Sequence, residues 1–184
     1  CYNKDLFKLT YRQSEAPVLE AIVKHGEVNI APEAYVDANY AAHDHLRSIA
    51  GWVIMLAGAA VTWSSKTIKT LATSTTNAEI HALFNCSKDV VWTRRLIGEM
   101  GYLLPPTIIH EDNSAAQSWA NSLDLKQRNK HLEIKNFYVR QLKKRNEIVV
   151  VHVDTKNQLA DPLTKNLPKD AYWGFMRTIT GAIG

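Results

Sequence analysis

An aspartate inside a strand-like run places the strongest constraint on how this chain can fold. Residues 35–40 read YVDANY, and because side chains of a strand alternate between its faces, Tyr35, Asp37 and Asn39 share one face. If the strand is covered on both faces, the Asp37 carboxylate is partly dehydrated, and an unpaired charge there is costly. We therefore expect a positive group to meet Asp37.

The next two strand-like runs predict an antiparallel meander. Residues 52–56 and 60–64 follow the first run over short connections, and Gly58 marks a turn between them. A parallel crossover needs about a dozen residues or more, so three strands joined by short loops run antiparallel.

The rest of the chain alternates between helical and strand patterns. A long helix is predicted from Asn77 to Met100, because serine and threonine residues can cap its start and Gly101 can end it. The remaining predicted elements are a strand at 107–110, helices at 113–121 and 132–144, a strand at 147–153 and a helix from 157 onward. The predicted fold class is α/β, with a five-stranded mixed sheet and helices on both faces.

Four carboxylates fall where α/β sheets gather functional groups. Asp37 lies within a strand, Asp112 at a strand end, and Asp161 at a helix start. Glu79 lies on the apolar stripe of the long helix, where an exposed glutamate would not be found. Mg²⁺ takes oxygen ligands, and such a cluster without metal would repel itself. We therefore interpret the four carboxylates as ligands of divalent metal.

Each carboxylate also has a structural alternative, weakest for Asp37. Asp112 or Asp161 could cap the helix that follows it, and Glu79 could complement the helix dipole. Composition and spacing alone indicate a mixed α/β domain with metal-dependent phosphate chemistry.

Positive charge is concentrated in one stretch. Residues 124–147 contain eight basic and three acidic residues, a net +5, although the whole chain carries only +4. This favours a polyanionic partner, with an ordinary solvated helix face as the alternative.

The length and the apolar pattern limit the organisation of the chain. Its 184 residues are enough for one globular domain with short appendages. No apolar run has the length of a membrane span and no secretion leader is present, so we expect an intracellular protein without a membrane partner. The chain begins at Cys1, which suggests a piece of a longer polypeptide.

Seven motifs, in chain order, carry a family resemblance. They are YVDANY at 35–40, RSIAGW at 47–52, TWSSK at 62–66, AEI at 78–80, EDN at 111–113, KHLEI at 130–134 and QLADPLTK at 158–165. Together they resemble the ribonuclease H domain of copia-type LTR retrotransposon polyproteins. Asn39, Tyr40 and Ile80 stand where that family usually has aspartate, tryptophan and tyrosine, and none of these departures removes a carboxylate.

The resemblance implies a ribonuclease H fold that cuts the RNA strand of RNA–DNA hybrids with two Mg²⁺ ions, with Mn²⁺ as a substitute and no small-molecule cofactor. Asp37, Glu79, Asp112 and Asp161 match the catalytic carboxylates of the family in kind and order. Asp37 is expected to bridge both ions, with Glu79 and Asp112 completing one site and Asp161 the other. The residues expected to contact nucleic acid are Arg47, Asn113, Lys130, His131, Lys143, Lys144 and Arg145.

The resemblance also divides the chain. Residues 1–32 resemble the end of the connection from a reverse transcriptase, residues 33–167 the ribonuclease H domain, and residues 168–184 form a C-terminal tail. The implied partners are an RNA–DNA hybrid and the reverse transcriptase domain of the same polyprotein, and the implied location is a cytoplasmic virus-like particle. The roles of His131 and His152 are left open.

Two other functions are considered. A catalytically inactive ribonuclease H-like module would bind nucleic acid or brace a polymerase, but the presence of all four carboxylates disfavours it. An integrase or transposase core places its late glutamate on a helix after the second aspartate, whereas Glu79 precedes Asp112.

Overall fold

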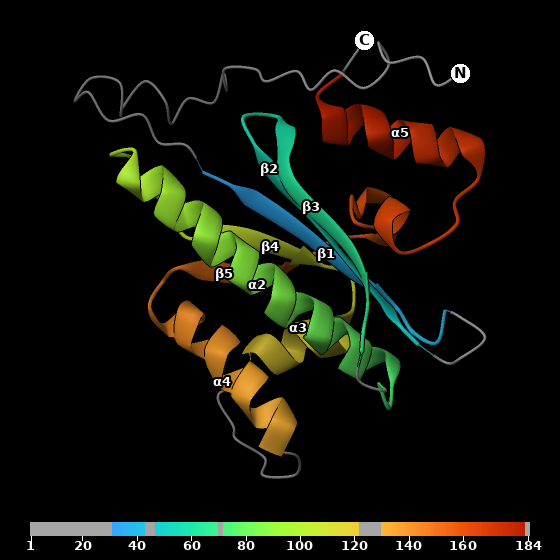
Figure 1. Cartoon of the computed structure of the whole chain (residues 1–184), viewed down its shortest axis with the longest axis horizontal. Coiled ribbons are helices and arrows are strands. Elements are labelled where there is room, and N and C mark those ends of the chain that lie inside the picture. The colour runs from blue at the N-terminus through green and yellow to red at the C-terminus, as the bar shows by residue number, and fades with distance from the viewer. Residues whose placement is uncertain (1–30, 43–46, 70–71, 122–129, 183–184) are drawn as a thin grey trace.

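One mixed sheet forms the centre of the molecule. The computed structural model describes residues 31–42, 47–69, 72–121 and 130–182, so most of the predicted leader, residues 1–30, lies outside the described part. The five strands lie in the order β3-β2-β1-β4-β5 (Figure 1). The predicted sheet, with its meander of strands 1–3, is confirmed.

Strand directions follow the lengths of the connections. The central strand β1 (Glu33–Asn39) pairs antiparallel with β2 (Ile49–Leu56), which in turn pairs antiparallel with β3 (Ala59–Thr67). On its other side β1 pairs parallel with β4 (Thr107–Glu111), and β4 pairs parallel with β5 (Ile148–His152). The carboxyl ends of β1, β4 and β5 therefore lie along one edge of the sheet.

Helices cover both faces of this sheet, as predicted (Figure 1). Helix α2 (Thr75–Glu99) packs across β1 and β2, and α3 (Ser114–Asn121) and α4 (Lys130–Lys144) lie on the same side. Helix α5 (Lys169–Thr180) packs on the opposite face against β3. No helix of the described part has both the length and the apolar character needed to cross a membrane.

Helix α2 forms where the capping and apolar patterns predict it. The Ser74 hydroxyl accepts a hydrogen bond from the Asn77 backbone N–H at 3.2 Å and so caps the first turn. Its inner face buries Leu83, Cys86 and Val90 in the main core. The same face carries Glu79 into the interior, where only 3% of the residue is exposed, so its predicted placement on the buried stripe is confirmed.

The predicted continuous helix from residue 157 is wrong. The chain instead forms two short 3-10 turns, η2 (Thr155–Asn157) and η3 (Asp161–Leu163), and begins helix α5 only at residue 169. Proline 168 disfavours helical geometry in the residue before it, and Pro162 fits only a first turn. Helix α5 lies within the stretch that the sequence marked as a tail.

Candidate active site

Three of the four predicted carboxylates converge. One carboxylate oxygen from each of Asp37, Glu79 and Asp112 lies within 4.8 Å of the other two. Asp37 comes from β1, Glu79 from the start of α2, and Asp112 from the loop after β4, and all three line a groove of about 440 Å³. The groove lies at the edge of the sheet where the parallel strands end, a common place for functional sites in α/β folds.

The fourth carboxylate joins this group through a lysine. Asp161 opens the turn η3, and the Nζ atom of Lys165 lies 2.9 Å from its Oδ1. The same Nζ lies 3.0 Å from Oδ1 of Asp37, and the hydroxyl of Thr164 donates to Oδ2 of Asp37. The expectation that a positive group meets Asp37 is therefore confirmed, and that group is Lys165.

A glycine allows the turn to approach the strand. Gly51 of β2 lies opposite Asp37 in the sheet register. A Cβ atom at residue 51 would lie 2.6 Å from Cγ2 of Thr164 and 2.9 Å from Cβ of Leu163, closer than side chains tolerate. Any larger residue would push the turn outward, so Gly51 is what lets Thr164 and Lys165 reach the strand.

Two hydrogen bonds from the sheet also fasten this turn. The side-chain amide of Asn39 donates to the Thr164 carbonyl at 3.1 Å, and the Ser65 hydroxyl donates to the Leu163 carbonyl at 2.6 Å. Both contacts join segments far apart in the sequence. The position of Asp161 is thus set by the packing of the fold.

A fifth carboxylate, Glu111, lies beside the cluster and was not assigned a role from the sequence. It ends β4, it is fully buried, and its Oε1 accepts a hydrogen bond from the Asn113 backbone N–H at 3.0 Å. The alternation along β4 could have predicted that Glu111 is buried, because Thr107, Ile109 and Glu111 share the buried face. Within the described residues, Oε2 of Glu111 and Oε2 of Glu79 have no hydrogen-bond partner.

Burial and crowded negative charge favour the protonated forms of two carboxyl groups. Burial, followed by the charges of Glu111, Asp37 and Asp112, raises the pKa of Glu79 from 4.5 to about 10. Burial also raises the pKa of Glu111 well above its usual range. The converging oxygens of Asp37, Glu79 and Asp112, with a buried and unpartnered oxygen on Glu79, fit a hard divalent cation such as Mg²⁺.

The lysine on the other side of Asp37 remains charged. Burial alone would lower the pKa of Lys165, but hydrogen bonds and charges from Asp161 and Asp37 outweigh that effect and raise it. Burial raises the pKa of Asp161, and the hydrogen bond from Lys165 opposes this. An ammonium group therefore lies between two carboxyl groups.

The capping alternatives for the aspartates are wrong. Helix α3 is capped by Asn113, whose side-chain oxygen accepts from the backbone N–H groups of Ala115 and Ala116 at 3.0 Å. Asp112 instead accepts a hydrogen bond from the Thr155 hydroxyl at 3.1 Å. The side chain of Asp161 makes no capping hydrogen bond in η3. Asn113, predicted to contact nucleic acid, thus also has a structural role.

The three basic residues at the end of α4 lie away from the carboxylates. The register pairs Thr107 with Ile148 at the start of β4 and β5 and Glu111 with His152 at their ends. Helix α4 leads into the start of β5, beside the start of β4, whereas Asp112 follows the end of β4. The length of the strands, about 13 Å for four steps, separates the two ends.

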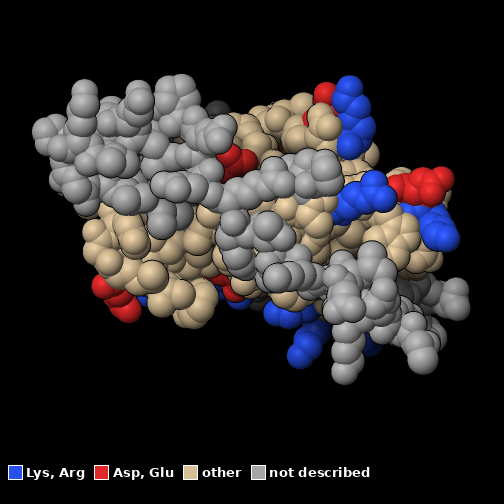
Figure 2. All heavy atoms as spheres, turned by 90° about the horizontal axis from the view of Figure 1, so that it is seen from above, with Lys and Arg blue, Asp and Glu red and all other residues tan. Residues whose placement is uncertain are grey.

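The residues predicted to bind nucleic acid have varied surroundings. The Lys143 ammonium donates to the Asn121 side chain, Arg145 lies 3.9 Å from Glu147, and Lys144 is exposed. Arg47 is exposed, and the side chains of Lys130 and His131 lie outside the described part. On the face seen in Figure 2, the described Lys and Arg side chains form separate groups, some beside acidic residues.

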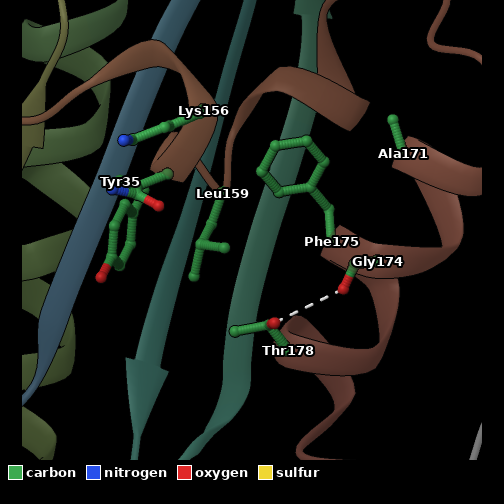
Figure 3. Close-up of a pocket in the computed structure, with 8 residues that line it drawn as sticks. Tyr35, Lys156, Leu159, Ala171, Gly174, Phe175 and Thr178 are labelled. Carbon is green, nitrogen blue, oxygen red and sulfur yellow. Dashed lines mark hydrogen bonds between the residues drawn. The ribbon is translucent and has the colours of Figure 1, made fainter.

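A larger hollow lies on the α5 side of the sheet. It measures about 660 Å³ and lies between β1, the turn η2 and α5, with Tyr35, Leu159 and Phe175 around it and Lys156 near its rim (Figure 3). None of its described lining residues is aspartate or glutamate. The carboxylate chemistry therefore belongs to the smaller groove.

Sequence comparison identifies relatives among transposon proteins. The chain is 34% identical over 148 residues to the retrovirus-related Pol polyproteins from transposons RE2 and RE1 of Arabidopsis thaliana. It is 28% identical over 141 residues to the Pol polyprotein from transposon TNT 1-94 of Nicotiana tabacum. These matches cover 79% and 76% of the chain, which spans only about a tenth of each relative (10% to 11%). No family model matches the chain.

Solved structures share the fold. LC11-RNase H1, crystallised in complex with an RNA/DNA hybrid, has a TM-score of 0.55 at 19% identity, covering 72% of this chain and 93% of that one. The N-terminal RNase H domain of Rv2228c from Mycobacterium tuberculosis has a TM-score of 0.56 at 14% identity, covering 81% and 98%. The chain therefore belongs to the Pol polyproteins of copia-type retrotransposons, and its described part has a ribonuclease H-like fold.

Proposed function

We propose that this chain is the ribonuclease H domain of its Pol polyprotein and hydrolyses the RNA strand of RNA–DNA hybrids during reverse transcription. The convergence of Asp37, Glu79 and Asp112 within 4.8 Å in an open groove carries this proposal. The complex of LC11-RNase H1 with an RNA/DNA hybrid, on the same fold, supports the substrate class.

The donor set of the groove suits Mg²⁺, with Mn²⁺ as a substitute. Two such ions, when bound, would supply an activated water for attack on phosphorus and stabilise the departing 3′ oxygen. Asp37 lies between Glu79 and Asp112 on one side and Asp161 on the other, so its two oxygens can serve both halves of the site. Glu79, protonated at neutral pH without metal because of its raised pKa, would release a proton when a cation binds.

Substrate recognition in this proposal depends on the shape and charge of the hybrid. Asn39, Tyr40 and Asn113 line the groove beside the carboxylates and can contact the sugar-phosphate backbone. The basic residues of α4 would contact phosphates, which gives affinity without reading sequence. The reverse transcriptase domain of the same polyprotein would deliver the hybrid.

The proposal is tested by cleavage of an RNA–DNA hybrid that carries a label on each strand in turn. We expect the chain to cut only the RNA strand, to need Mg²⁺ or Mn²⁺, and to lose activity in EDTA. Duplex DNA of the same sequence is the control substrate and should remain intact. Binding of the hybrid without cleavage at any Mg²⁺ concentration would instead identify an inactive nucleic-acid-binding module.

A further inference from the structure

Lys165 occupies the space that Asp37 and Asp161 enclose. Its Nζ lies 3.0 Å from Oδ1 of Asp37 and 2.9 Å from Oδ1 of Asp161. The two aspartate side chains are only 1% and 7% exposed, whereas the lysine side chain is 33% exposed. The carboxylates are therefore fixed in the interior, and the lysine reaches them from the rim of the groove.

We propose that Lys165 is a positioning residue that holds the place of a cation between Asp37 and Asp161, and that a divalent ion enters this half of the site by displacing its ammonium group. The inference rests on the proposed metal-dependent function. It concerns only this half of the site, because Glu79 and Asp112 have no ion pair among the described residues.

Simultaneous occupation by both cations is unfavourable for geometric reasons. Mg²⁺ binds carboxylate oxygens at about 2.1 Å, and the ammonium already lies within hydrogen-bond distance of the same two oxygens. The other oxygen of Asp37 accepts the Thr164 hydroxyl, so Oδ1 is the Asp37 oxygen that faces the ammonium and for which the two cations would compete. Two cations on one pair of oxygens would lie a few ångströms apart and repel each other.

The local structure allows the ammonium to leave while the carboxylates stay. Hydrogen bonds from Asn39 and Ser65 and the close packing at Gly51 hold the backbone of the turn. The lysine side chain, by contrast, is a flexible four-carbon stem that can move its ammonium into solvent. Without metal, the ammonium offsets repulsion between Asp37 and Asp161 and so lets both carboxylates stay close to the same point.

The test compares Mg²⁺ binding by the full chain and by Lys165→Met, using calorimetry and the rise in Tm with added Mg²⁺. The matched control is Lys169→Met, a nearby exposed lysine at the start of α5. We expect Lys165→Met to have a lower Tm in EDTA and a larger rise in Tm with Mg²⁺. Its dissociation constant for the ion between Asp37 and Asp161 should be about tenfold lower, because the competing charge-assisted hydrogen bonds are gone. Lys169→Met should match the wild type.

Lys165→Gln is the second variant if Lys165→Met does not fold, because an amide keeps the polarity and most of the stem without the charge. Wild-type affinity for Mg²⁺ in a folded Lys165 variant, or weaker affinity, overturns the inference. If the wild type binds Mg²⁺ and cuts hybrids but the variant is unchanged, only the inference fails. If neither protein binds Mg²⁺, both the inference and the proposed metal-dependent function fail.

Discussion

The two halves of the carboxylate site differ in how their charge is balanced. Asp37, Glu79 and Asp112 bring three oxygens together, and no described basic residue forms an ion pair with Glu79 or Asp112. Asp37 and Asp161 instead share the ammonium of Lys165. No described basic residue therefore balances the charge of Glu79 and Asp112 in the first half, whereas the second half contains an ammonium group that belongs to the chain.

This difference follows from the elements that build each half. Strand β1, helix α2 and the residue directly after β4 supply the first half, and the packing of these elements holds the carboxylates close together despite the repulsion. The second half depends on a short turn, in which Asp161 and Lys165 are four residues apart and form an ion pair as neighbours on a helix do. We infer that firmly packed elements can hold like charges close together, whereas a carboxylate on a short turn needs an opposite charge nearby.

The largest expected effect is that of a change in Asp37, which both halves share. Asp37→Asn should reduce hybrid cleavage in Mg²⁺ by at least about a hundredfold, because a neutral amide binds divalent ions much more weakly than a carboxylate does. Asp170→Asn, an exposed acid on α5, should cut at the wild-type rate. Single-turnover cleavage of a labelled hybrid measures both. Near wild-type cleavage by Asp37→Asn would show that the two halves do not share a ligand.

Gly51→Ala should disturb the second half selectively. The added Cβ would clash with Thr164 and Leu163, and overpacking of this kind costs about 1–3 kcal/mol. The turn should move outward, so both stability and cleavage should fall. Urea unfolding and cleavage rates test this, with Gly98→Ala as the control because a Cβ at residue 98 meets nothing within 4 Å. Equal behaviour of the two variants would show that the turn is not fixed by this packing.

The first half should make stability depend on pH when metal is absent. The pKa of Glu79 is raised from 4.5 to about 10. Between these two pH values the folded state therefore binds a proton that the unfolded state has released. Its stabilising contribution is complete below pH 4.5 and is lost as the pH rises through about 10, with a slope of at most about 1.4 kcal/mol per pH unit. Glu111 acts in the same direction.

Unfolding of wild type and Glu79→Gln in EDTA at several pH values measures this dependence. Glu79→Gln should weaken the decline in stability between pH 5 and pH 9, because the amide does not titrate. It should also be the more stable protein at the alkaline end, where wild-type Glu79 is forced towards ionisation. The same dependence of unfolding free energy on pH in both proteins would mean that Glu79 is not the group whose protonation stabilises this half.

Periodicity predicted the parts of the fold that depend on local pattern. The strand around Asp37 and the buried stripe of α2 with Glu79 were predicted because each is governed by neighbours within a few residues. The helix from residue 157 was wrong, since the composition was helical but Pro162 and Pro168 divide it. Local pattern predicts elements better than it predicts their boundaries.

Within the site, the sequence identified the carboxylates but not their partners. Lys165 is 128 residues from Asp37, and they meet because η3 packs on Gly51 and the sheet fastens the turn with hydrogen bonds. The sequence predicted that Asp37 needs a positive partner without indicating which residue supplies it. The burial of Glu111 was readable from strand alternation, but its proximity to Glu79 depends on the packing of α2 against the sheet.

The smallest effect on turnover is expected from the basic end of α4. Replacing Lys143, Lys144 and Arg145 with glutamine should weaken hybrid binding and flatten its dependence on salt, since each phosphate contact adds roughly −0.9 to the slope of log affinity against log salt on duplex DNA. The turnover rate at saturating hybrid should change little, because these residues lie at the opposite end of the sheet from both halves of the carboxylate site.

Hybrid binding titrated at several salt concentrations, beside single-turnover cleavage at saturation, separates affinity from chemistry in this triple variant. Lys66→Gln, which removes one lysine that lies 5.3 Å from the Trp52 ring centroid on another part of the surface, is a control for loss of charge alone. A salt slope equal to that of the wild type would mean that the end of α4 points away from the hybrid. A large fall in saturated turnover would mean that these residues act on the carboxylates despite the length of the strands between them.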